Sequence, residues 1–425
     1  MADYTSMWND LGLDLDRHNE LLELLGGAYT QFFLSQQNRP EGMQYFDFVV
    51  SEAHGLRIQE LVEHKANGGT VVGAFCVFVP EDIVLAAGGV PVGLCAGADF
   101  AVSDSEGLIP RNTCPLIRAS LGFKLNRTCP YIQCSDFLVG ETTCDGKKKM
   151  YEVMADYHPI YVMEVPQKDT EAAHDLFRAE VAAFKDKMEA ESGRKIDVSS
   201  LAEATEKVEA KKRALARFHA ARAANPAPVS GLDAVLVSQI SFYDDIDRFT
   251  TKVNELADEL QGRAQRGEGV FPESTPRILY AGTPIPLPDW KIHATVEAAG
   301  GVIVGEESCV GSRYYTTTTP AHDGTLDGRL TAISERLLGT HCACFTPNDE
   351  RVDDIIDMVR ATDADGVVSY SLSFCQVYEN EAVKVEKALQ KEGIPVISLQ
   401  SDFSPNDDAQ LLTRVQAFVE MLQAR

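Results

Sequence analysis

The chain has 425 residues, of which 44% are hydrophobic and 24% charged, a composition typical of globular proteins. Its formal net charge of −25 argues against nonspecific nucleic-acid binding, which needs a basic surface to neutralise phosphates. The longest apolar run, residues 71–80, is shorter than the ~18 residues that a membrane helix needs, and no export signal is visible at the N-terminus. We therefore expect a cytoplasmic protein of at least two domains, without a membrane or nucleic-acid partner.

Short β-rich runs alternate with helical segments from about residue 67 onward, which predicts an α/β fold with parallel strands. Two stretches interrupt this alternation, because residues 1–66 look mainly helical and residues from 168 onward look like charged amphipathic helices. The predicted regions are an N-terminal helical region (1–66), a first α/β domain (67–167), a helical connector (168–270) and a second α/β domain (271–425).

The two α/β regions resemble each other. "VVGAFCVFVPEDIVLAAGGVPVG" (71–93) and "ILYAGTPIPLPDWKIHATVEAAGGVIVG" (278–305) share a strand, a helix start with Pro and an acidic residue, an AAGG helix end and a V-x-V-G strand. This pattern indicates one α/β unit used twice. The alternative is that any two α/β units look alike at this level of detail.

Ten cysteines in a reducing cytosol are better interpreted as metal ligands or redox groups than as disulfides. Four of them follow predicted strands, namely Cys76, Cys144, Cys309 and Cys375. In open parallel sheets, ligands bind at the carboxyl ends of the strands, where the next helix also presents free N–H groups. Two such domains facing each other would bring these thiols into one interdomain cleft.

The spacing of the cysteines weighs against two local metal modules. Zinc knuckles favour C-x2–4-C pairs, and only Cys342-x-Cys344 and Cys129-x4-Cys134 come close to that spacing. The ferredoxin run C-x2-C-x2-C is absent. A cluster assembled from distant residues remains, with Cys95 and Cys134 expected to be core residues.

The segment "GETTCDGK" (140–147) has the look of a phosphate-binding loop but does not match one, because Lys148 stands where Ser or Thr is required. ATP, if the system uses it, is then hydrolysed by another protein. We expect the lysines at 147–149 to lie in the first turn of a helix and to face solvent, with an acidic partner as the alternative.

Several longer motifs together resemble one family. They are "GAFCVFVPEDIVLAAGGVPV", "RNTCPLIRASLGF", "TCPYIQCSDFLVGETTCDGKKKMYEVM", "YVMEVPQ", "EESCVGSRYY", "CACFTPNDERVDDI" and "DGVVSYSLSFCQVYENEAVKVEKAL". From about Gly73 to the C-terminus, the chain resembles the subunits of 2-hydroxyacyl-CoA dehydratases and benzoyl-CoA reductases, and within that family the double-cubane cluster proteins.

The resemblance implies two flavodoxin-like or Rossmann-like domains with an iron–sulfur cluster in the cleft between them. In the double-cubane branch this is an [Fe8S9] cluster with six cysteine ligands, and in the dehydratases a [4Fe–4S] cluster with about three. The candidate ligands are Cys76, Cys114, Cys129, Cys144, Cys309, Cys344 and Cys375, with Cys342 as a possible substitute for Cys344. The cluster itself would be the catalytic group.

The function that the resemblance implies is low-potential reduction of small unsaturated molecules such as acetylene, in an anaerobe. The expected assembly is a homodimer served by a separate ATP-hydrolysing activator that carries its own [4Fe–4S] cluster. Two alternatives stay open: a 2-hydroxyacyl-CoA dehydratase subunit, and a non-catalytic electron-storage or metal-binding protein.

Overall fold

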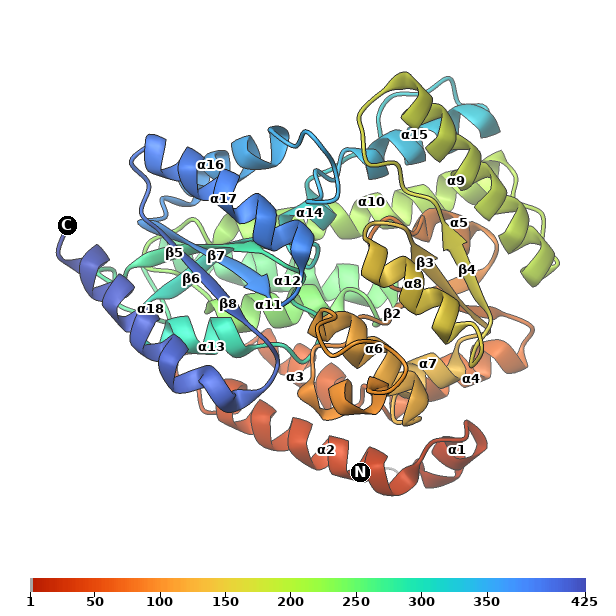
Figure 1. Cartoon of the computed structure of the whole chain (residues 1–425), viewed down its shortest axis with the longest axis horizontal. Coiled ribbons are helices and arrows are strands. Elements are labelled where there is room, and N and C mark those ends of the chain that lie inside the picture. The colour runs from red at the N-terminus through yellow and green to blue at the C-terminus, as the bar shows by residue number, and fades with distance from the viewer. Residues whose placement is uncertain (1–2) are drawn as a thin grey trace.

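The computed structural model describes residues 3–425 and contains two parallel four-stranded sheets (Figure 1). The strands of the first sheet are β1 (Thr70–Ala74), β2 (Gly89–Gly93), β3 (Phe137–Glu141) and β4 (Ile160–Met163). Those of the second are β5 (Arg277–Gly282), β6 (Val302–Glu307), β7 (Gly366–Leu372) and β8 (Val396–Ser401). Their orders are β2-β1-β3-β4 and β6-β5-β7-β8, so the two sheets share one topology. The predicted α/β class with two Rossmann-like domains is confirmed.

Helices fill the regions before and between the strands. The N-terminal region holds α1 (Thr5–Asp10), α2 (Leu15–Tyr29), the π-helix η1 (Thr30–Leu34), α3 (Met43–Ser51) and α4 (Leu56–Ala66). The first α/β domain adds α5 (Glu81–Ala86), the 3-10 helix η2 (Asp99–Ser105), α6 (Pro115–Leu125), α7 (Pro130–Cys134) and α8 (Asp145–Met154).

The remaining helices belong to the connector and the second domain. The connector holds α9 (Glu171–Ser192), α10 (Val198–Ala221), α11 (Gly231–Ile240) and α12 (Ile246–Gln265). The second domain has α13 (Lys291–Ala298), α14 (Ser312–Tyr315), α15 (Leu326–Leu338), α16 (Glu350–Thr362), α17 (Gln376–Lys391), η3 (Pro405–Asp407) and α18 (Asp408–Gln423).

The inner strands are apolar because parallel strands are covered on both faces. Every residue of the inner strands β3, β5 and β7 is buried, as is every residue of the edge strand β6, whereas the edge strands β4 and β8 are partly exposed. The apolar runs that predicted these strands therefore also identify the inside of each domain.

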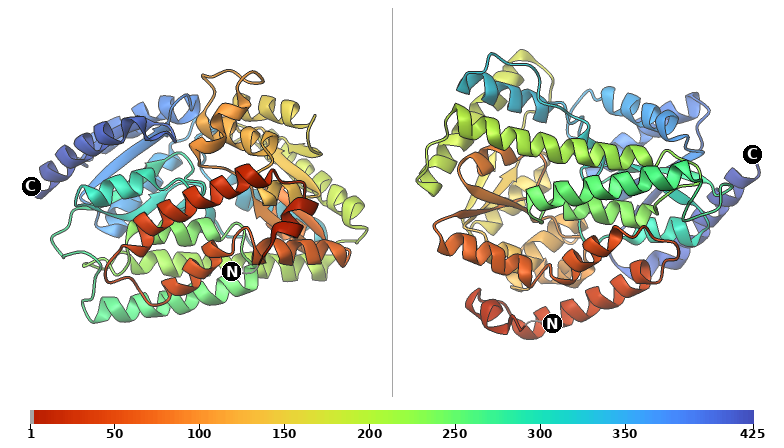
Figure 2. Two further views of the ribbon diagram at one scale, coloured as in Figure 1. Left: turned by 90° about the horizontal axis from the view of Figure 1, so that it is seen from below. Right: turned by 180° about the vertical axis from the view of Figure 1, so that it is seen from behind.

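The connector ties the two domains together. Helix α10 contacts α5 of the first domain and α14 and α15 of the second, and it runs along the back of the molecule (Figure 2, right). In addition, α15 packs on α9, and Leu330, Ile333, Cys342 and Cys344 share an apolar cluster with Val72 of the first sheet. The chain between β6 and β7 thus reaches across to the first domain, and the predicted domain limits stay a prediction.

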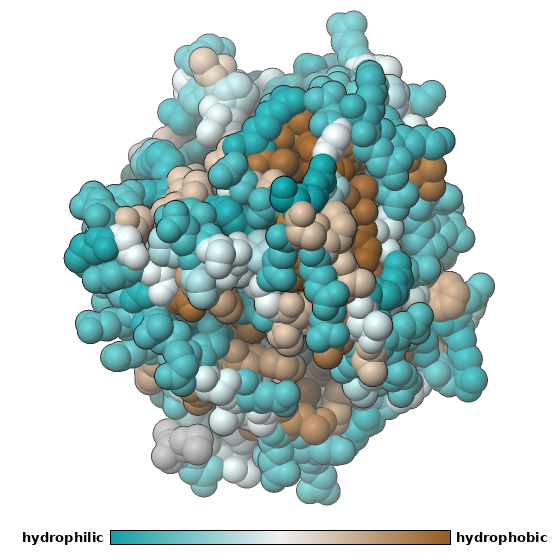
Figure 3. Space-filling model, turned by 90° about the vertical axis from the view of Figure 1, so that its left-hand side faces the viewer, coloured by the Kyte–Doolittle hydropathy of each residue, from teal (hydrophilic) through white to brown (hydrophobic). Residues whose placement is uncertain are grey.

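Polar side chains dominate the outer surface, as the net charge of −25 leads one to expect. On the face shown in Figure 3, apolar side chains are visible mainly in hollows between polar ones. Within residues 3–425, no helix combines the length and the apolar character needed to cross a membrane.

Candidate functional site

A cavity of about 600 Å³ lies between the two domains and is lined by residues from both sheets and from the connector. Cysteines are its most distinctive lining. Eight of the ten contribute: Cys76, Cys95, Cys114, Cys144, Cys309, Cys342, Cys344 and Cys375. The structure therefore brings together six of the seven predicted ligands, the proposed substitute Cys342, and Cys95. Their role as ligands stays a prediction.

The four strand-end cysteines lie where the sequence places them. Cys76 and Cys309 stand two residues beyond β1 and β6, and Cys144 and Cys375 stand three residues beyond β3 and β7. Cys144 caps α8, where its Sγ accepts a hydrogen bond from the Lys147 backbone N–H at 3.4 Å. Cys375 is in the same position before α17. The positive ends of two helices thus face the cavity, one from each domain.

The other lining thiols come from the longer connections between the second and third strand of each domain. Cys114 is the N-cap of α6, and the Cys375 thiol lowers its pKa. Cys342 raises the pKa of Cys309, and the thiols of Cys309 and Cys344 shift the pKa of Cys342.

These effects divide the thiols into two groups. We call Cys114, Cys144 and Cys375 the Cys114 group, and Cys76, Cys309, Cys342 and Cys344 the Cys342 group, because charge on each member affects another member of the same group. Each group draws on both domains, so neither domain alone completes one.

Most of these thiols are costly to ionise. Burial raises the pKa of Cys76 well above its usual value, and the contact with Cys342 raises that of Cys309. Cys114 is the exception, since the Cys375 thiol lowers its pKa. Thiolates, the form that binds metal, therefore need positive charge nearby or a bound metal in this cavity.

Cys95 departs from the expectation that it is a core residue. It lines the cavity, its thiol donates to the Phe75 carbonyl at 2.8 Å, and burial raises its pKa to about 12. A signal was present in the sequence, because Cys95 stands two residues beyond β2 just as Cys309 stands two beyond the corresponding strand β6.

Cys129 and Cys134 lie outside the cavity lining, at the start and the end of α7. Cys134 is fully buried, as a core residue would be. Cys129, one of the predicted ligands, caps α7, and burial raises its pKa to about 11.

The expectation that Lys147 faces solvent is wrong. Its side chain is only 13% exposed, lines the cavity and forms an ion pair with the fully buried Glu141. Tyr151 and Thr143 also donate to that carboxylate, at 3.0 and 2.9 Å. Lys148 and Lys149 are exposed as predicted.

A second buried cation lies beside the Cys342 group. Arg313 forms an ion pair with Glu307 at the end of β6, and its Nη2 is 3.7 Å from Cys309 Sγ. Glu307 also accepts from Arg351 at 2.7 Å, and Arg351 in turn contacts Glu381 at 2.6 Å. None of these charges was identified from the sequence.

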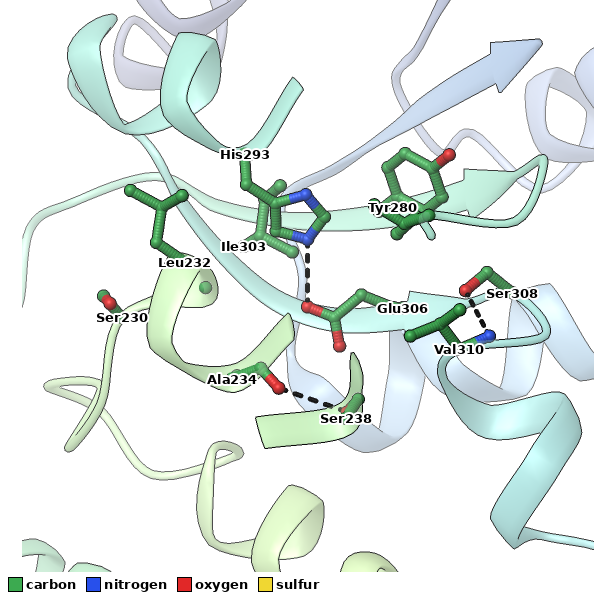
Figure 4. A network of polar contacts seen from close by, with 12 residues as sticks. Ser230, Leu232, Ala234, Ser238, Tyr280, His293, Ile303, Glu306, Ser308 and Val310 are labelled. Carbon is green, nitrogen blue, oxygen red and sulfur yellow. Dashed lines mark hydrogen bonds and ion pairs between the residues drawn. The ribbon is translucent and has the colours of Figure 1, made fainter. Parts of the chain in front are cut away.

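A second set of contacts, made by Glu306 and Ser308, also holds the end of β6 in place (Figure 4). Glu306 contacts His293 at 3.3 Å, as Figure 4 shows, and Arg222 of the connector holds both of its oxygens. Ser308 then accepts from the Val310 backbone N–H at 3.2 Å, in the bend that carries Cys309. This network determines where the chain turns into the cavity.

The rest of the cavity wall suits an organic molecule. Leu94 and Leu287 provide apolar surface, and the hydroxyls of Thr283 and Tyr243 are buried without a hydrogen-bond partner among the described residues. Phe374, next to Cys375, is 52% exposed and has a left-handed backbone with φ of 66°, which is unusual for a bulky residue.

No three His, Cys, Asp or Glu side chains within residues 3–425 converge closely enough to hold a single metal ion. The thiols instead surround a larger space.

The sequence matches the family described as "2-hydroxyglutaryl-CoA dehydratase, D-component" over residues 76–422. It is 36% identical to an Escherichia coli protein named as dehydratase subunit YjiM, over 88% of this chain and 96% of the relative. It is 25% identical to the (R)-phenyllactyl-CoA dehydratase beta subunit of Clostridium sporogenes, over 84% of this chain and 93% of the relative.

A third relative is the beta subunit of (R)-2-hydroxyglutaryl-CoA dehydratase from Acidaminococcus fermentans, with 25% identity over 85% of this chain and 95% of the relative. The resemblance found in the sequence motifs is thereby confirmed at the level of the family, without its double-cubane branch, as is its implication that the protein is an enzyme. The chain belongs to the 2-hydroxyglutaryl-CoA dehydratase D-component family.

Proposed function

We propose that this chain is the cluster-binding subunit of an enzyme of the 2-hydroxyacyl-CoA dehydratase type. The observation that carries the proposal is the single cavity lined by eight cysteines from two domains. The names of the relatives support dehydration of a 2-hydroxyacyl-CoA better than the reduction of acetylene-like molecules that the sequence motifs favoured.

The chemistry of the lining fits an iron–sulfur cluster, since cysteine thiolates are the usual ligands of such clusters. The Cys114 group and the Cys342 group would hold it, with the starts of α8 and α17 directing N–H groups toward its negative charge. When bound, the cluster would supply electron transfer at low potential and an iron site for a substrate.

The chain's own residues would bind and orient the substrate. The apolar wall around Leu94 and Leu287 would exclude water. Phe374, with its exposed ring beside Cys375, would contact the substrate as it enters.

A separate protein would have to supply the energised electron. Residues 140–147, the segment nearest to a phosphate loop, form the end of β3 and the start of α8, and the ammonium of Lys147 is held by Glu141. We therefore include in the proposal an ATP-hydrolysing activator. A homodimer is part of the same proposal, to be tested by analytical ultracentrifugation with and without a second subunit.

One observation favours a second candidate, a double-cubane reductase of small unsaturated molecules. The cavity holds two groups of three and four thiols, more than the roughly three that a single [4Fe–4S] cluster of the dehydratase type uses. Both candidates use the same cavity and differ in the cluster and the substrate.

The first test is the metal content of anaerobically purified protein. About four irons per chain with matching sulfide would support the dehydratase proposal, and about eight would support the double-cubane candidate. Zinc without sulfide would reject both and leave a metal-binding protein.

The second test is turnover with ATP, a strong reductant and a separate iron–sulfur activator. Dehydration of (R)-2-hydroxyacyl-CoA substrates, with no product from acetylene, is the expected result. The opposite substrate preference would establish the second candidate, and iron without any turnover on either substrate would point to electron storage. Full turnover without ATP would reject the activator.

A further inference from the structure

We propose that Lys147 and Arg313 raise the reduction potential of a cluster bound in the cavity. Each of them holds a buried positive charge next to thiols that line one side of the cavity. The inference rests on the proposed function, because it requires a cluster among the thiols. It concerns how this chain's own charges set the energy of that cluster, whichever substrate the enzyme uses.

In the first domain, the orientation of the Lys147–Glu141 pair is the relevant observation. Lys147 lines the cavity, whereas Glu141 lies behind it and does not. The carboxylate is held in that position by Tyr151, which does not line the cavity, and by Thr143, which does. The charge of Lys147 affects the pKa values of Cys95 and Cys144 more than that of Glu141 does, whereas Glu141 has the larger effect on the pKa of Cys76.

The second domain has a related arrangement, in which the cation lies behind a lining thiol and does not itself line the cavity. Arg313 Nη2 contacts Cys309 Sγ at 3.7 Å and donates to the Gly282 carbonyl at 2.9 Å, while Glu307 binds the same guanidinium and does not line the cavity. Arg351 lies on the far side of Glu307, and Glu381 neutralises it. The charge closest to a thiol is again positive.

The two arrangements do not follow from the internal repeat. Both have a glutamate at the end of a strand and a cation six residues later, with a cysteine between them: "VGETTCDGK" and "VGEESCVGSR". However, one follows β3 and the other β6, and the sheet orders make β7, not β6, the counterpart of β3. The same combination of a buried glutamate and a cation six residues later therefore occurs at two positions that the internal repeat does not relate, both of them near the one cavity.

Stability gives little reason to keep such pairs. Burying two charges costs desolvation energy, and a buried pair can often be replaced by apolar side chains without loss of stability. A charge in this setting nevertheless acts strongly on its neighbours, because little water screens it. Charge and hydrogen bonds around the sulfurs are among the factors that set the potential of an iron–sulfur cluster, and a nearby cation favours the reduced form.

The experiment is a redox titration of the holoprotein, followed by EPR and visible absorption, for variants with equal iron content. Removal of the carboxylate alone, in Glu141→Gln, should raise the midpoint potential above that of the native protein. Removal of both charges, in Glu141→Gln/Lys147→Gln, should lower the potential below the native value. Removal of the cation alone, in Lys147→Gln, should lower it furthest. For Lys147→Gln we expect about a tenfold lower ratio of reduced to oxidised cluster at a fixed potential, which is about 59 mV for a one-electron couple. Arg313→Gln should shift the ratio in the same direction.

Two controls separate charge from structure. Lys147→Arg and Arg313→Lys keep the charge and should retain the native potential. Lys148→Gln removes an exposed charge one residue away from Lys147 and should not shift the potential. If Lys147→Gln does not retain iron, Glu141→Gln and Lys147→Arg still decide the question. Native potentials in all variants, or equal shifts in the Lys148 control, would overturn the inference while leaving the cluster proposal intact. A native protein without iron and sulfide would overturn both.

Discussion

The two α/β domains have the same strand order but contribute thiols differently. Cysteines follow the second and third strands of both domains, as Cys95 and Cys309 and as Cys144 and Cys375. After the first strand only one domain has a cysteine, Cys76, because Thr283 and Pro284 occupy that place beyond β5. The shared strand order therefore determines the positions beyond the strand ends at which a ligand can lie, and the two domains have cysteines at different sets of these positions.

The largest effect should come from the equivalent pair Cys144 and Cys375. Each caps a helix at the carboxyl end of the third strand of its domain, and both belong to the Cys114 group. We expect Cys144→Ser and Cys375→Ser each to lose more than half of the bound iron, because a serine hydroxyl is a poor substitute for a thiolate. Iron and sulfide analysis after anaerobic purification measures this.

The matched control is Cys134→Ala, which removes a buried thiol outside the cavity and should leave the iron content unchanged. Loss of iron from only one of the two equivalent variants would show that the domains are not alike at this position. Equal loss in all three would mean that folding, not ligation, explains the result.

A second difference between the domains lies in their buried glutamates. Glu307 neutralises two arginines whose side chains are at most 3% exposed, whereas Glu141 pairs with a single lysine at the cavity wall. Glu307→Ala leaves the buried Arg313 without a carboxylate and Arg351 with Glu381 alone, and it should lower the free energy of unfolding by about 3–5 kcal/mol. Glu141→Ala should cost less, because water in the cavity can reach Lys147.

Urea unfolding of the two variants tests this order. The exposed pair Lys149–Glu152 provides the control, since both side chains are more than 60% exposed and Glu152→Ala should change stability by less than about 0.5 kcal/mol. A larger loss for Glu141→Ala than for Glu307→Ala would contradict the comparison.

Much of this architecture could be predicted from the sequence, because local patterns determine it. Apolar runs followed by helical periodicity identified every strand, and the AAGG repeat anticipated the identical strand orders. The strand-end rule also located Cys76, Cys144, Cys309 and Cys375 correctly, since parallel strands place their carboxyl ends at one edge.

The parts that could not be predicted depend on contacts between distant residues. The orientation of Lys147 depends on Glu141 being buried behind the cavity wall, and a run of three lysines carries no sign of that. The position of Cys342 depends on residues 326–344 crossing to the first domain, which the spacing of the cysteines does not reveal. Cys95 was missed although its distance from β2 matched the rule.

One histidine in each domain, His158 and His341, should make the stability respond to pH in opposite directions. Burial lowers the pKa of His158 in the first domain from 6.5 to about 4, so the unfolded chain binds the proton more readily. The unfolding free energy should therefore fall by ~1–2 kcal/mol as the pH decreases from about 6.5 toward 4. His158→Gln should flatten this part of the curve.

His341 in the second domain has the opposite sign, because its hydrogen bond with Asp354 raises its pKa. Its contribution, less than about 1 kcal/mol for a partly exposed pair, is present below pH 6.5 and is lost as the pH rises through the folded-state pKa. His341→Gln should lower stability at pH 6 and leave it unchanged at pH 9. Urea midpoints at several pH values would show both effects, and parallel curves for the two variants would contradict them.

The smallest expected effect concerns two alike segments of the first domain, Cys114-Pro115 and Cys129-Pro130. In both, the cysteine is the N-cap and the proline begins the helix, and in both the backbone N–H groups of the first turn act to lower the pKa of the thiol. Only Cys114 lines the cavity.

Because serine is itself a good N-cap, Cys129→Ser should preserve the helix start and change the unfolding free energy by no more than about 1 kcal/mol. Its iron content should equal that of the native protein, whereas Cys114→Ser, with the same local chemistry, should lose iron. Because the two segments are otherwise alike, a difference between Cys114→Ser and Cys129→Ser can be attributed to the position of the cysteine relative to the cavity. Iron loss in Cys129→Ser would instead show that a residue outside the cavity lining is also a ligand.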